Sequence, residues 1–370
     1  MCLRLCILAA ALPACVLSAE ALPRADIEAW VLGMGGAVDR NSASELHAID
    51  LGRSWVTDAD LRKLEGAASL VSLKLAQTDV SDRVLEIVAS LPSLRELDMF
   101  FCEDITDAGA SLLRRASRLE RLNLRGTKIS DSGVKFLTEI KTLEVLDIGI
   151  TEVSDASAGL LEALPNLKRL AIGGNKIGES GIASLRSLRQ LEHLDLSGAQ
   201  VTDSGIWAVT VTDLNLNEIA GLPRLESLNL AAPSPEYVQA ISTGVPRLRG
   251  AIRITDFGAK QLAALSKLRK LNLSRSMLTA EGIQSLGSLE NLEELVLSHV
   301  SSLDDSAGRA LASLPSLQVV DVSFTAFGPS GAAALREHPK LQRLIAVGTA
   351  VTEAAAAEFT AANPSRDVIR

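Results

Sequence analysis

Polar side chains that could bind a cation or a basic peptide, or supply two carboxylates for hydrolysis, recur at regular intervals along the chain. Each lies four residues after a leucine and between two apolar residues, and successive leucines are mostly 24 or 25 residues apart. The residues at this position, most of them Asp or Asn, are Asp50, Lys74, Asp98, Asn123, Asp147, Ala171, Asp195, Asn229, Asn272, Val296, Asp321 and Ile345. The sequence therefore predicts a polar stripe, rich in carboxylates, across successive copies of one element.

Aromatic and arginine side chains stand beside the early part of this stripe. Phe100 and Phe101 are adjacent in a chain that has seven Phe and one Tyr, and a few aromatic or Arg anchors dominate the binding energy of most interfaces. We expect a partner to contact Arg53, Lys74, Asp98, Phe100, Phe101, Asn123, Arg125, Asp147 and Ile150. Two alternatives remain open: one Phe packs into a turn while the other covers it, and the stripe is a solvated part of the scaffold.

No known catalytic motif accompanies these residues. The chain has no Gly-x-x-x-x-Gly-Lys-Ser/Thr phosphate loop, no Gly-x-Ser-x-Gly turn and no His-Glu-x-x-His pair. The four histidines fall in separate repeats, and no cysteines are paired as in a zinc site. We therefore expect a protein without enzyme activity, cofactor or metal.

The elements that must position the stripe are specified by a leucine pattern. The spelling Leu-x-x-Leu-x-Leu, with some substitutions, begins at Leu46, Leu70, Leu94, Leu119, Leu143, Leu167, Leu191, Leu225, Leu248, Leu268, Leu292, Leu317 and Leu341. In one copy, alternation across Leu122 and Leu124 predicts a short strand with both side chains inward, and Ser130 or Asp131 begins a helix after the turn. The predicted fold class is α/β: a right-handed horseshoe-shaped solenoid of about 13 repeats with a parallel concave sheet.

Two more positions of the repeat have structural interpretations. A Thr or Ser followed by Asp marks the expected helix start at Thr57, Ser81, Thr106, Ser154 and Thr202. Side chains eight residues after each start are small and polar, and we expect them to bond turn backbone groups: Ser54, Thr78, Cys102, Thr127, Thr151, Asn175, Ser276, Thr325 and Thr349. Cys102 is thus expected to be buried and unreactive.

The extended spelling Leu-x-x-Leu-x-Leu-x-x-Thr-x-[Ile/Val]-[Ser/Thr]-Asp-x-Gly covers residues 46 to about 360 and resembles the leucine-rich repeats of secreted bacterial proteins of the planctomycete type. It is also similar to F-box-associated leucine-rich repeats. Gly35-Gly36-Ala-Val38, before the first strand, fits the bacterial group, and we expect no F-box-like helical domain ahead of it. The resemblance implies a horseshoe with a binding role and no active site.

Composition and charge narrow the partner class. The 45 acidic and 37 basic residues give a formal charge of −8, which disfavours a nucleic-acid partner. The stretch from Leu5 to Leu17, preceded by Arg4, predicts a signal peptide over residues 1–19 and no membrane span. We therefore expect a secreted, periplasmic or cell-envelope protein, with lipid attachment at Cys15 as the alternative.

The remaining chain divides into three segments. Residues 20–45 are expected to form a capping helix and turn, 46–362 the solenoid, and 363–370 a C-terminal tail. The period breaks around 201–260, where Val211-Thr-Asp repeats the helix start at Val201-Thr-Asp. A decayed repeat and a loop that shapes the binding surface both explain this break.

The expected function is a non-enzymatic scaffold that binds a protein partner through its concave face. A glycan- or cell-wall-binding envelope module is one alternative, because a stripe of Asp and Asn flanked by aromatic residues also suits sugars. A cytoplasmic F-box-type substrate adaptor is another, and it requires that residues 1–19 are not a signal peptide.

The N-terminal stretch gives the first testable prediction. Cleavage after Ala19 makes Glu20 the first residue of the exported protein. N-terminal sequencing of protein recovered from outside the cytoplasm measures this directly. A mature chain that starts at a lipid-modified Cys15 would show membrane anchoring instead, and an intact Met1 would contradict export.

Overall fold

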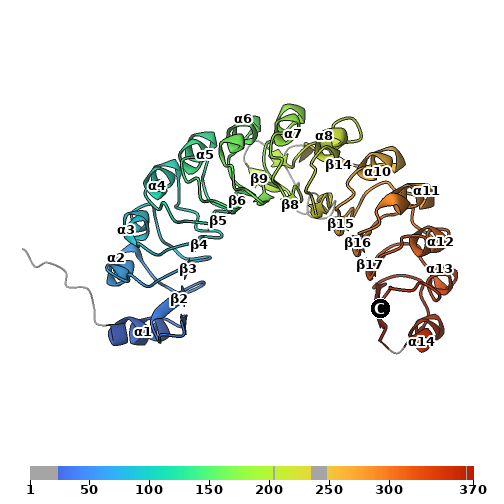
Figure 1. The fold of residues 1–370 in the computed structure, drawn as a ribbon, viewed down its shortest axis with the longest axis horizontal. Helices are drawn as coiled ribbons and strands as arrows, with labels where there is room; N and C mark the ends of the chain where they lie inside the picture. Colours follow the sequence, from blue (N-terminus) through green and yellow to red (C-terminus); the bar gives the residue numbers. More distant parts are fainter. Residues whose placement is uncertain (1–23, 203–204, 235–247, 364) are drawn as a thin grey trace, which may run out of the picture.

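The computed structural model describes residues 24–202, 205–234, 248–363 and 365–370, so the expected signal peptide lies outside the described residues. The chain forms an arc whose strands line the inner, concave side and whose helices line the outer, convex side (Figure 1). The expected horseshoe-shaped solenoid of strand and helix repeats is confirmed.

The concave side is one sheet, which has 14 strands in the described part of the chain. In order they are β1 (Ala37–Arg40), β2 (Leu46–Asp50), β3 (Ser72–Lys74), β4 (Glu96–Asp98), β5 (Arg121–Asn123), β6 (Val145–Asp147), β7 (Arg169–Ala171), β8 (His193–Asp195), β12 (Ser227–Asn229), β15 (Lys270–Asn272), β16 (Glu294–Val296), β17 (Val319–Asp321), β18 (Arg343–Ile345) and β19 (Asp367–Ile369). Only β1 and β2 pair in antiparallel fashion among these strands. Equivalent residues lie opposite one another, as Leu122 and Leu146 do.

Short helices return the chain along the convex side. They are α1 (Arg24–Gly33), α2 (Asp58–Leu61), α3 (Val84–Ser90), α4 (Asp107–Leu113), α5 (Asp131–Leu137), α6 (Asp155–Leu160), α7 (Glu179–Leu185), α8 (Leu216–Ala220), α10 (Asp256–Leu262), α11 (Ala280–Ser285), α12 (Ala307–Ala312), α13 (Pro329–Ala334) and α14 (Glu353–Ala362). Three 3₁₀ segments extend these helices: η1 (Arg62–Leu64), η2 (Leu161–Ala163) and η3 (Leu286–Ser288).

The core is a continuous column of aliphatic side chains between strands and helices. Leu122 and Leu124 point inward and are at most 1% exposed, as the alternation predicts. Val134 and Leu137, on the inner side of α5, are also fully buried. Because one strand and one short helix cannot enclose these side chains, each repeat relies on its neighbours to bury them.

An aspartate ladder links the helix starts of successive repeats. Ser130 caps α5 by accepting a hydrogen bond from the Ser132 amide, while its own amide donates to Asp107 Oδ1 of the preceding repeat at 2.8 Å. Asp131 accepts in the same way from Ser154. Glycine stands two residues after Asp107, Asp131 and Asp256, and it leaves room for the carboxylate of the repeat before it, as Gly133 does for Asp107.

A second ladder closes the turns that follow the strands. The hydroxyl groups of Thr78 and Thr127 donate to the carbonyl oxygens three residues earlier, each at 2.7 Å. Cys102 takes part through its Sγ, which lies 3.1 Å from the Leu75 carbonyl oxygen. The expected burial of Cys102 within this ladder is confirmed, and burial raises the pKa of its thiol.

The irregular region differs from its expectation in two respects. Thr202 does not begin a helix: β9 (Gln200–Thr202) and β10 (Gly205–Trp207) form an antiparallel hairpin, joined in parallel by β13 (Leu248–Arg249). The expected strand at Leu248 therefore does not join the concave sheet, where β12 pairs directly with β15. In this copy of the pattern Ala251 and the exposed Arg253 stand where the other repeats mostly have inward leucines or other large aliphatic residues. The segment therefore lacks the buried side chains that hold a strand in the concave sheet.

The second Val-Thr-Asp of this long repeat supplies its ladder aspartate, and α8 begins three residues later at Leu216. Asp213 occupies the ladder position and accepts a hydrogen bond from the Thr255 amide at 3.0 Å. The preceding pair, β11 (Val211–Thr212) with β14 (Ile252–Arg253), aligns these segments. This repeat is ten residues longer than a regular one, and the hairpin lies in that insertion, ahead of the ladder aspartate.

Both ends of the solenoid are closed by local elements. α1 and antiparallel β1 form the N-terminal cap, with Ile27 and Val31 buried against the first repeat. The segment 363–370, expected as a tail, contributes β19 to the sheet instead. Arg366 is buried there, and its guanidinium group donates to three backbone carbonyl oxygens.

Truncation of a central leucine tests the register. We expect Leu146→Ala to lower the free energy of unfolding by about 2 to 5 kcal/mol, because Leu146 is 1% exposed between two occupied rungs. Chemical denaturation of the variant and the parent measures the difference. Equal stability would contradict the inward placement of Leu146.

The aspartate ladder gives a second stability prediction. Burial alone would raise the pKa of Asp131, but hydrogen bonds from Ser154 and Ser157 outweigh it and lower that pKa. We expect Asp131→Ala to cost about 1 to 3 kcal/mol at neutral pH, because those buried donors lose their acceptor. Since the folded-state pKa is the lower one, the stabilisation is complete above about pH 3.9 and is lost as the pH falls through the lowered value.

Unfolding measured from pH 7 down to pH 2 should show the two curves converging at low pH. The exposed Asp79, replaced by Ala, is the matched control, and its effect should be small. A pH-independent gap between Asp131→Ala and the parent would contradict the role of the charged carboxylate.

Candidate functional site

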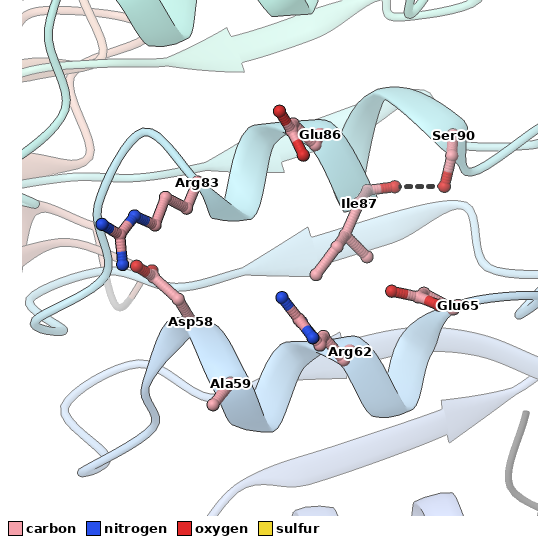
Figure 2. A pocket seen from close by; sticks show the side chains of 8 residues that line it. All are labelled: Asp58, Ala59, Arg62, Glu65, Arg83, Glu86, Ile87 and Ser90. Atoms are coloured by element: carbon pink, nitrogen blue, oxygen red, sulfur yellow. Dashed lines mark hydrogen bonds between the residues drawn. The ribbon is translucent and has the colours of Figure 1, made fainter. Parts of the chain in front are cut away.

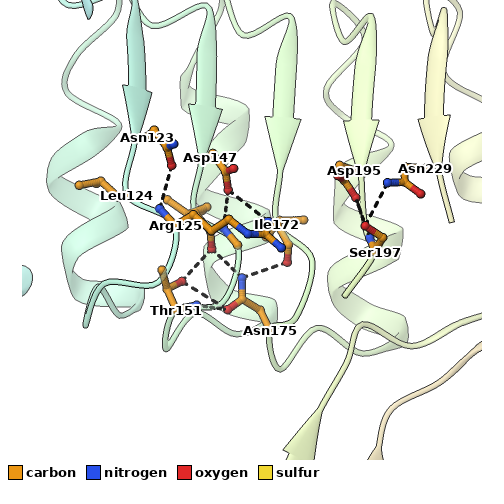
Figure 3. A network of polar contacts seen from close by, with 12 residues as sticks. Asn123, Leu124, Arg125, Asp147, Thr151, Ile172, Asn175, Asp195, Ser197 and Asn229 are labelled. Carbon is orange, nitrogen blue, oxygen red and sulfur yellow. Dashed lines mark hydrogen bonds and ion pairs between the residues drawn. The ribbon is translucent and has the colours of Figure 1, made fainter. Parts of the chain in front are cut away.

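The polar stripe lies at the carboxyl ends of the concave strands, where most of its members hold the backbone. Asp147 Oδ1 accepts from the Gly149 amide at 2.8 Å, and Asn123 Oδ1 accepts from the Arg125 amide at 3.0 Å (Figure 3). Asp195 accepts from both the amide and the hydroxyl of Ser197. These bonds support the interpretation of the stripe as scaffold.

Two stripe carboxylates are shifted toward the neutral form. Burial raises the pKa of Asp98 and of Asp147, and hydrogen bonds and nearby cations offset it only in part. The cation nearest Asp147 is Arg125, whose Nη1 lies 3.7 Å from Asp147 Oδ1. Both carboxylates are therefore partly removed from solvent, and Asp147 also lies near a cation of the adjacent rung.

A hollow of about 320 Å³ lies on the concave face across β6, β7, β8 and β12. Asp147 and Asp195 line one side, and Arg169 and His193 line the other. Burial, reinforced by Arg169, lowers the pKa of His193, so its imidazole is neutral at pH 7. This hollow presents polar groups of both signs.

The position seven residues after each repeat start has a left-handed backbone in eleven repeats. Glycine occupies it at Gly126, Gly174, Gly198 and Gly348, whereas the other seven residues there are Arg53, Gln77, Phe101, Ile150, Arg275, His299 and Phe324. A β-branched side chain is rare at positive φ, because its Cβ substituents crowd the backbone. This left-handed column was not expected from the sequence, although the alternation of bulky residues with glycine is visible there.

The residues expected to bind a partner lie on the first five rungs, and some are close together. The rings of Phe100 and Phe101 meet edge to face with centroids 4.7 Å apart, and both residues are half-buried. Phe101 lies over Gly126, where an added Cβ would come within 2.8 Å of the ring. The Arg125 side chain, 19% exposed, extends past Gly149 on the next rung.

Arg53 lies apart from this cluster. Its Nε donates to Gln77 Oε1 at 2.8 Å, and the rung of Gln77 separates it from Phe101. Lys74, Asp98, Asn123 and Asp147 occupy consecutive strands β3 to β6, as expected from the repeat register.

The inserted hairpin adds a groove that sequence reasoning missed. The groove has a volume of about 410 Å³ and lies between the hairpin and the loops of earlier repeats. We call this the hairpin groove; it is lined by Phe101, Glu103, Gly126, Thr127, Lys128, Ile150, Glu152, Ala199, Gln200 and Val201. Only a correct assignment of residues 200–207 as strands could have revealed it.

Large apolar side chains are exposed in several repeats, most of them between strand end and helix start and Phe257 in the first turn of α10. Trp55 is 87% exposed, and Leu214, Phe257 and Met277 are 83%, 63% and 60% exposed. Phe324 is exposed as well and stacks on His299 with ring centroids 4.5 Å apart. The exposure of Trp55, Leu214 and Met277 was not expected from the sequence, because a single apolar side chain in a loop has no sequence signature.

A larger groove of about 750 Å³ lies on the convex side, between α2 with η1 and α3 (Figure 2). Arg62, Glu65, Arg83 and Glu86 line it, so both charge signs are present. A similar groove of about 410 Å³ lies between η2 and α7. Such grooves arise where the curvature of the solenoid spreads neighbouring helices, and they do not single out a site.

Metal sites and membrane spans are both missing from the described ranges. Those ranges contain no group of three or more His, Cys, Asp or Glu side chains placed to hold a metal ion. No helix between residues 24 and 370, apart from the undescribed gaps, is long and apolar enough to cross a membrane.

Comparisons with known proteins agree with the repeat architecture. A family model described as a leucine-rich repeat matches residues 90–113, 117–137, 163–185, 187–208 and 313–335. The structure of an internalin from Listeria monocytogenes is 18% identical, with 95% of this chain and 96% of that chain covered and a TM-score of 0.57. A leucine-rich-repeat protein of Leptospira interrogans is also 18% identical, with 91% and 94% coverage and a TM-score of 0.40. The Rad7 and Elc1 complex of yeast is 15% identical, with 94% and 83% coverage and a TM-score of 0.49.

Leucine-rich-repeat proteins are generally scaffolds for protein–protein interaction and are typically not enzymes. The matched repeats, the parallel sheet of stacked rungs and the helices on its convex side give this chain the fold of a leucine-rich-repeat solenoid.

Proposed function

We propose that this protein is a non-enzymatic scaffold that binds a protein partner through the early part of its concave face. The observation that carries the proposal is the cluster of Phe100, Phe101 and Arg125, which lies beside the polar stripe on two adjacent rungs. Half-buried aromatic rings and an ordered guanidinium group are the usual anchors of protein interfaces, because they bind with little loss of conformational entropy.

The setting of Arg125 supports this role. Its Nη1 lies 3.7 Å from Asp147 Oδ1 and its side chain is 19% exposed, so a partner carboxylate or carbonyl group can reach the guanidinium donors. Asp98 and Lys74 flank the cluster on neighbouring strands and would act as rim charges.

We also propose that the protein acts outside the cytoplasm, on the basis of the apolar stretch from Leu5 to Leu17 after Arg4. A glycan partner is the competing outcome. The two partners are separated by adding wall-derived glycan fragments or protein extract to the immobilised mature chain and identifying what is retained.

The decisive experiment replaces Phe100, Phe101 and Arg125 together by Ala. Once the partner is captured and identified, we expect its affinity to fall by at least 30-fold, about 2 kcal/mol, with little change in folding. Isothermal titration measures affinity, and circular dichroism measures folding. Lys74→Ala should mainly change the association rate and its salt dependence.

The control lies at the opposite end of the arc. Phe324 and Arg343 are replaced by Ala in a second variant, since they also combine an exposed aromatic ring with a strand arginine. If this control loses binding while the first variant retains it, the proposed surface is wrong and the C-terminal repeats carry the site.

A further inference from the structure

At the hairpin groove the solenoid departs from its repeat pattern, because an inserted strand lies over earlier repeats. One wall is the inserted strand β9, and the other is formed by loops of the third to fifth repeats. Ala199, at the start of the hairpin, lies over Gly174, and the Ile150 side chain lies over the same glycine. The groove therefore exists only because the insertion folds back over earlier rungs, near the middle of the arc in Figure 1.

Its apolar lining includes two residues in a costly backbone conformation. Phe101 and Ile150 both have a φ of +52°, although glycine serves at the equivalent position on the rungs of Gly126 and Gly174. The conformation is disfavoured for any L-residue and most for a β-branched one. Neither side chain completes the buried core, since both are only half-buried. A bulky residue there costs stability without a matching gain in packing.

Its rim carries uncompensated negative charge. Glu103 and Glu152 are exposed, and neither forms an ion pair within the part of the chain that the structure describes. The nearby cations are engaged: Lys128 Nζ lies 3.4 Å from Asp104 Oδ1, and Lys176 Nζ lies 5.1 Å from the centre of the Trp207 ring. The basic groups of a partner can therefore pair with Glu103 and Glu152, which flank the apolar lining of the groove.

We propose that the hairpin groove binds an extended segment of the protein partner, in which an apolar side chain stands between two basic residues. The apolar side chain packs on Phe101, Ile150 and Val201, and the basic residues pair with Glu103 and Glu152. The proposal rests on the proposed function, because it specifies the chemistry of the same partner, but it involves residues beyond the concave cluster.

Defined peptides test the chemistry before the partner itself is identified. The probes are capped Gly-Lys-Leu-Lys-Gly, its charge-reversed form Gly-Glu-Leu-Glu-Gly, and Gly-Lys-Ser-Lys-Gly, titrated into the full mature chain while the Ile150 methyl signals are followed by NMR. We expect the Lys-Leu-Lys peptide to bind at least about tenfold more tightly than either other peptide. Equal affinities, or no shift of the Ile150 signals, would overturn the proposal.

Two variants separate binding from folding. Ile150→Gly relieves the backbone strain, so the variant should unfold near the temperature of the parent. It should bind the Lys-Leu-Lys peptide about tenfold more weakly, measured by isothermal titration because the variant has no Ile150 methyl groups. Glu103→Gln with Glu152→Gln should remove the preference for Lys-Leu-Lys over its charge-reversed form.

Phe324→Gly is the matched control for Ile150→Gly: its φ is +57°, it lies over Gly348, and it is outside the groove. A peptide that binds Ile150→Gly as it binds the parent would contradict the proposal.

The captured partner distinguishes this inference from the proposed function. Loss of that partner on Arg125→Ala but not on Glu103→Gln with Glu152→Gln leaves the concave site standing and overturns the groove. Loss on the glutamine pair alone supports the groove and overturns the concave site. Sedimentation of the parent and Ile150→Gly chains completes the test, because a parent dimer that dissociates in the variant shows that a second copy occupies the groove.

Discussion

No repeat of this protein can satisfy its own polar groups or bury its own apolar side chains. The Asp107 carboxylate accepts a hydrogen bond from the amide of Ser130 in the next repeat, and Asp131 accepts in the same way from Ser154. Leu122 has a leucine directly opposite it on the following strand, Leu146. Stability is therefore a sum of nearest-neighbour contacts, and each residue of these columns is fixed by the column and not by a ligand.

The same dependence explains how the chain accommodates its insertion. An insertion of ten residues, which contains the hairpin, lies between β8 and α8. Asp213 still accepts a hydrogen bond from Thr255, and β12 still pairs with β8 and β15. The hairpin has its own small cluster, in which Ile206 packs with Ala199 and Ala208, separate from the main core. The insertion contacts other repeats through β13 and through Gly174, but not through the concave sheet or the aspartate ladder, and it forms a surface that the regular repeats lack.

The fold was largely predictable because its columns are redundant: leucines, helix-start aspartates and turn hydroxyls each report the same period. The prediction of the helix start was wrong where two segments have the same sequence, Val201-Thr-Asp and Val211-Thr-Asp. Val201-Thr-Asp matches a helix start, but Val201 lies in β9, which pairs with β10. β10 pairs in turn with Leu248 and Arg249, which are distant in sequence. The stripe was correctly placed on the concave strands, and its carboxylates turned out to bond turn amides. The hairpin groove could not be predicted, because its two walls come from segments about 50 to 100 residues apart.

The left-handed column shows where the scaffold leaves the sequence free to encode recognition. The turn requires a positive φ, which glycine adopts at little cost, so a bulky residue there is not demanded by the fold. Where one occurs, the following rung often has glycine to make room: Phe101 lies over Gly126, Ile150 over Gly174 and Phe324 over Gly348. Such a pair is a coordinated choice at two positions 24 or 25 residues apart, and it places an apolar side chain at the edge of the concave face. Retaining such pairs despite their backbone cost is readily explained if selection acts on the surface they form.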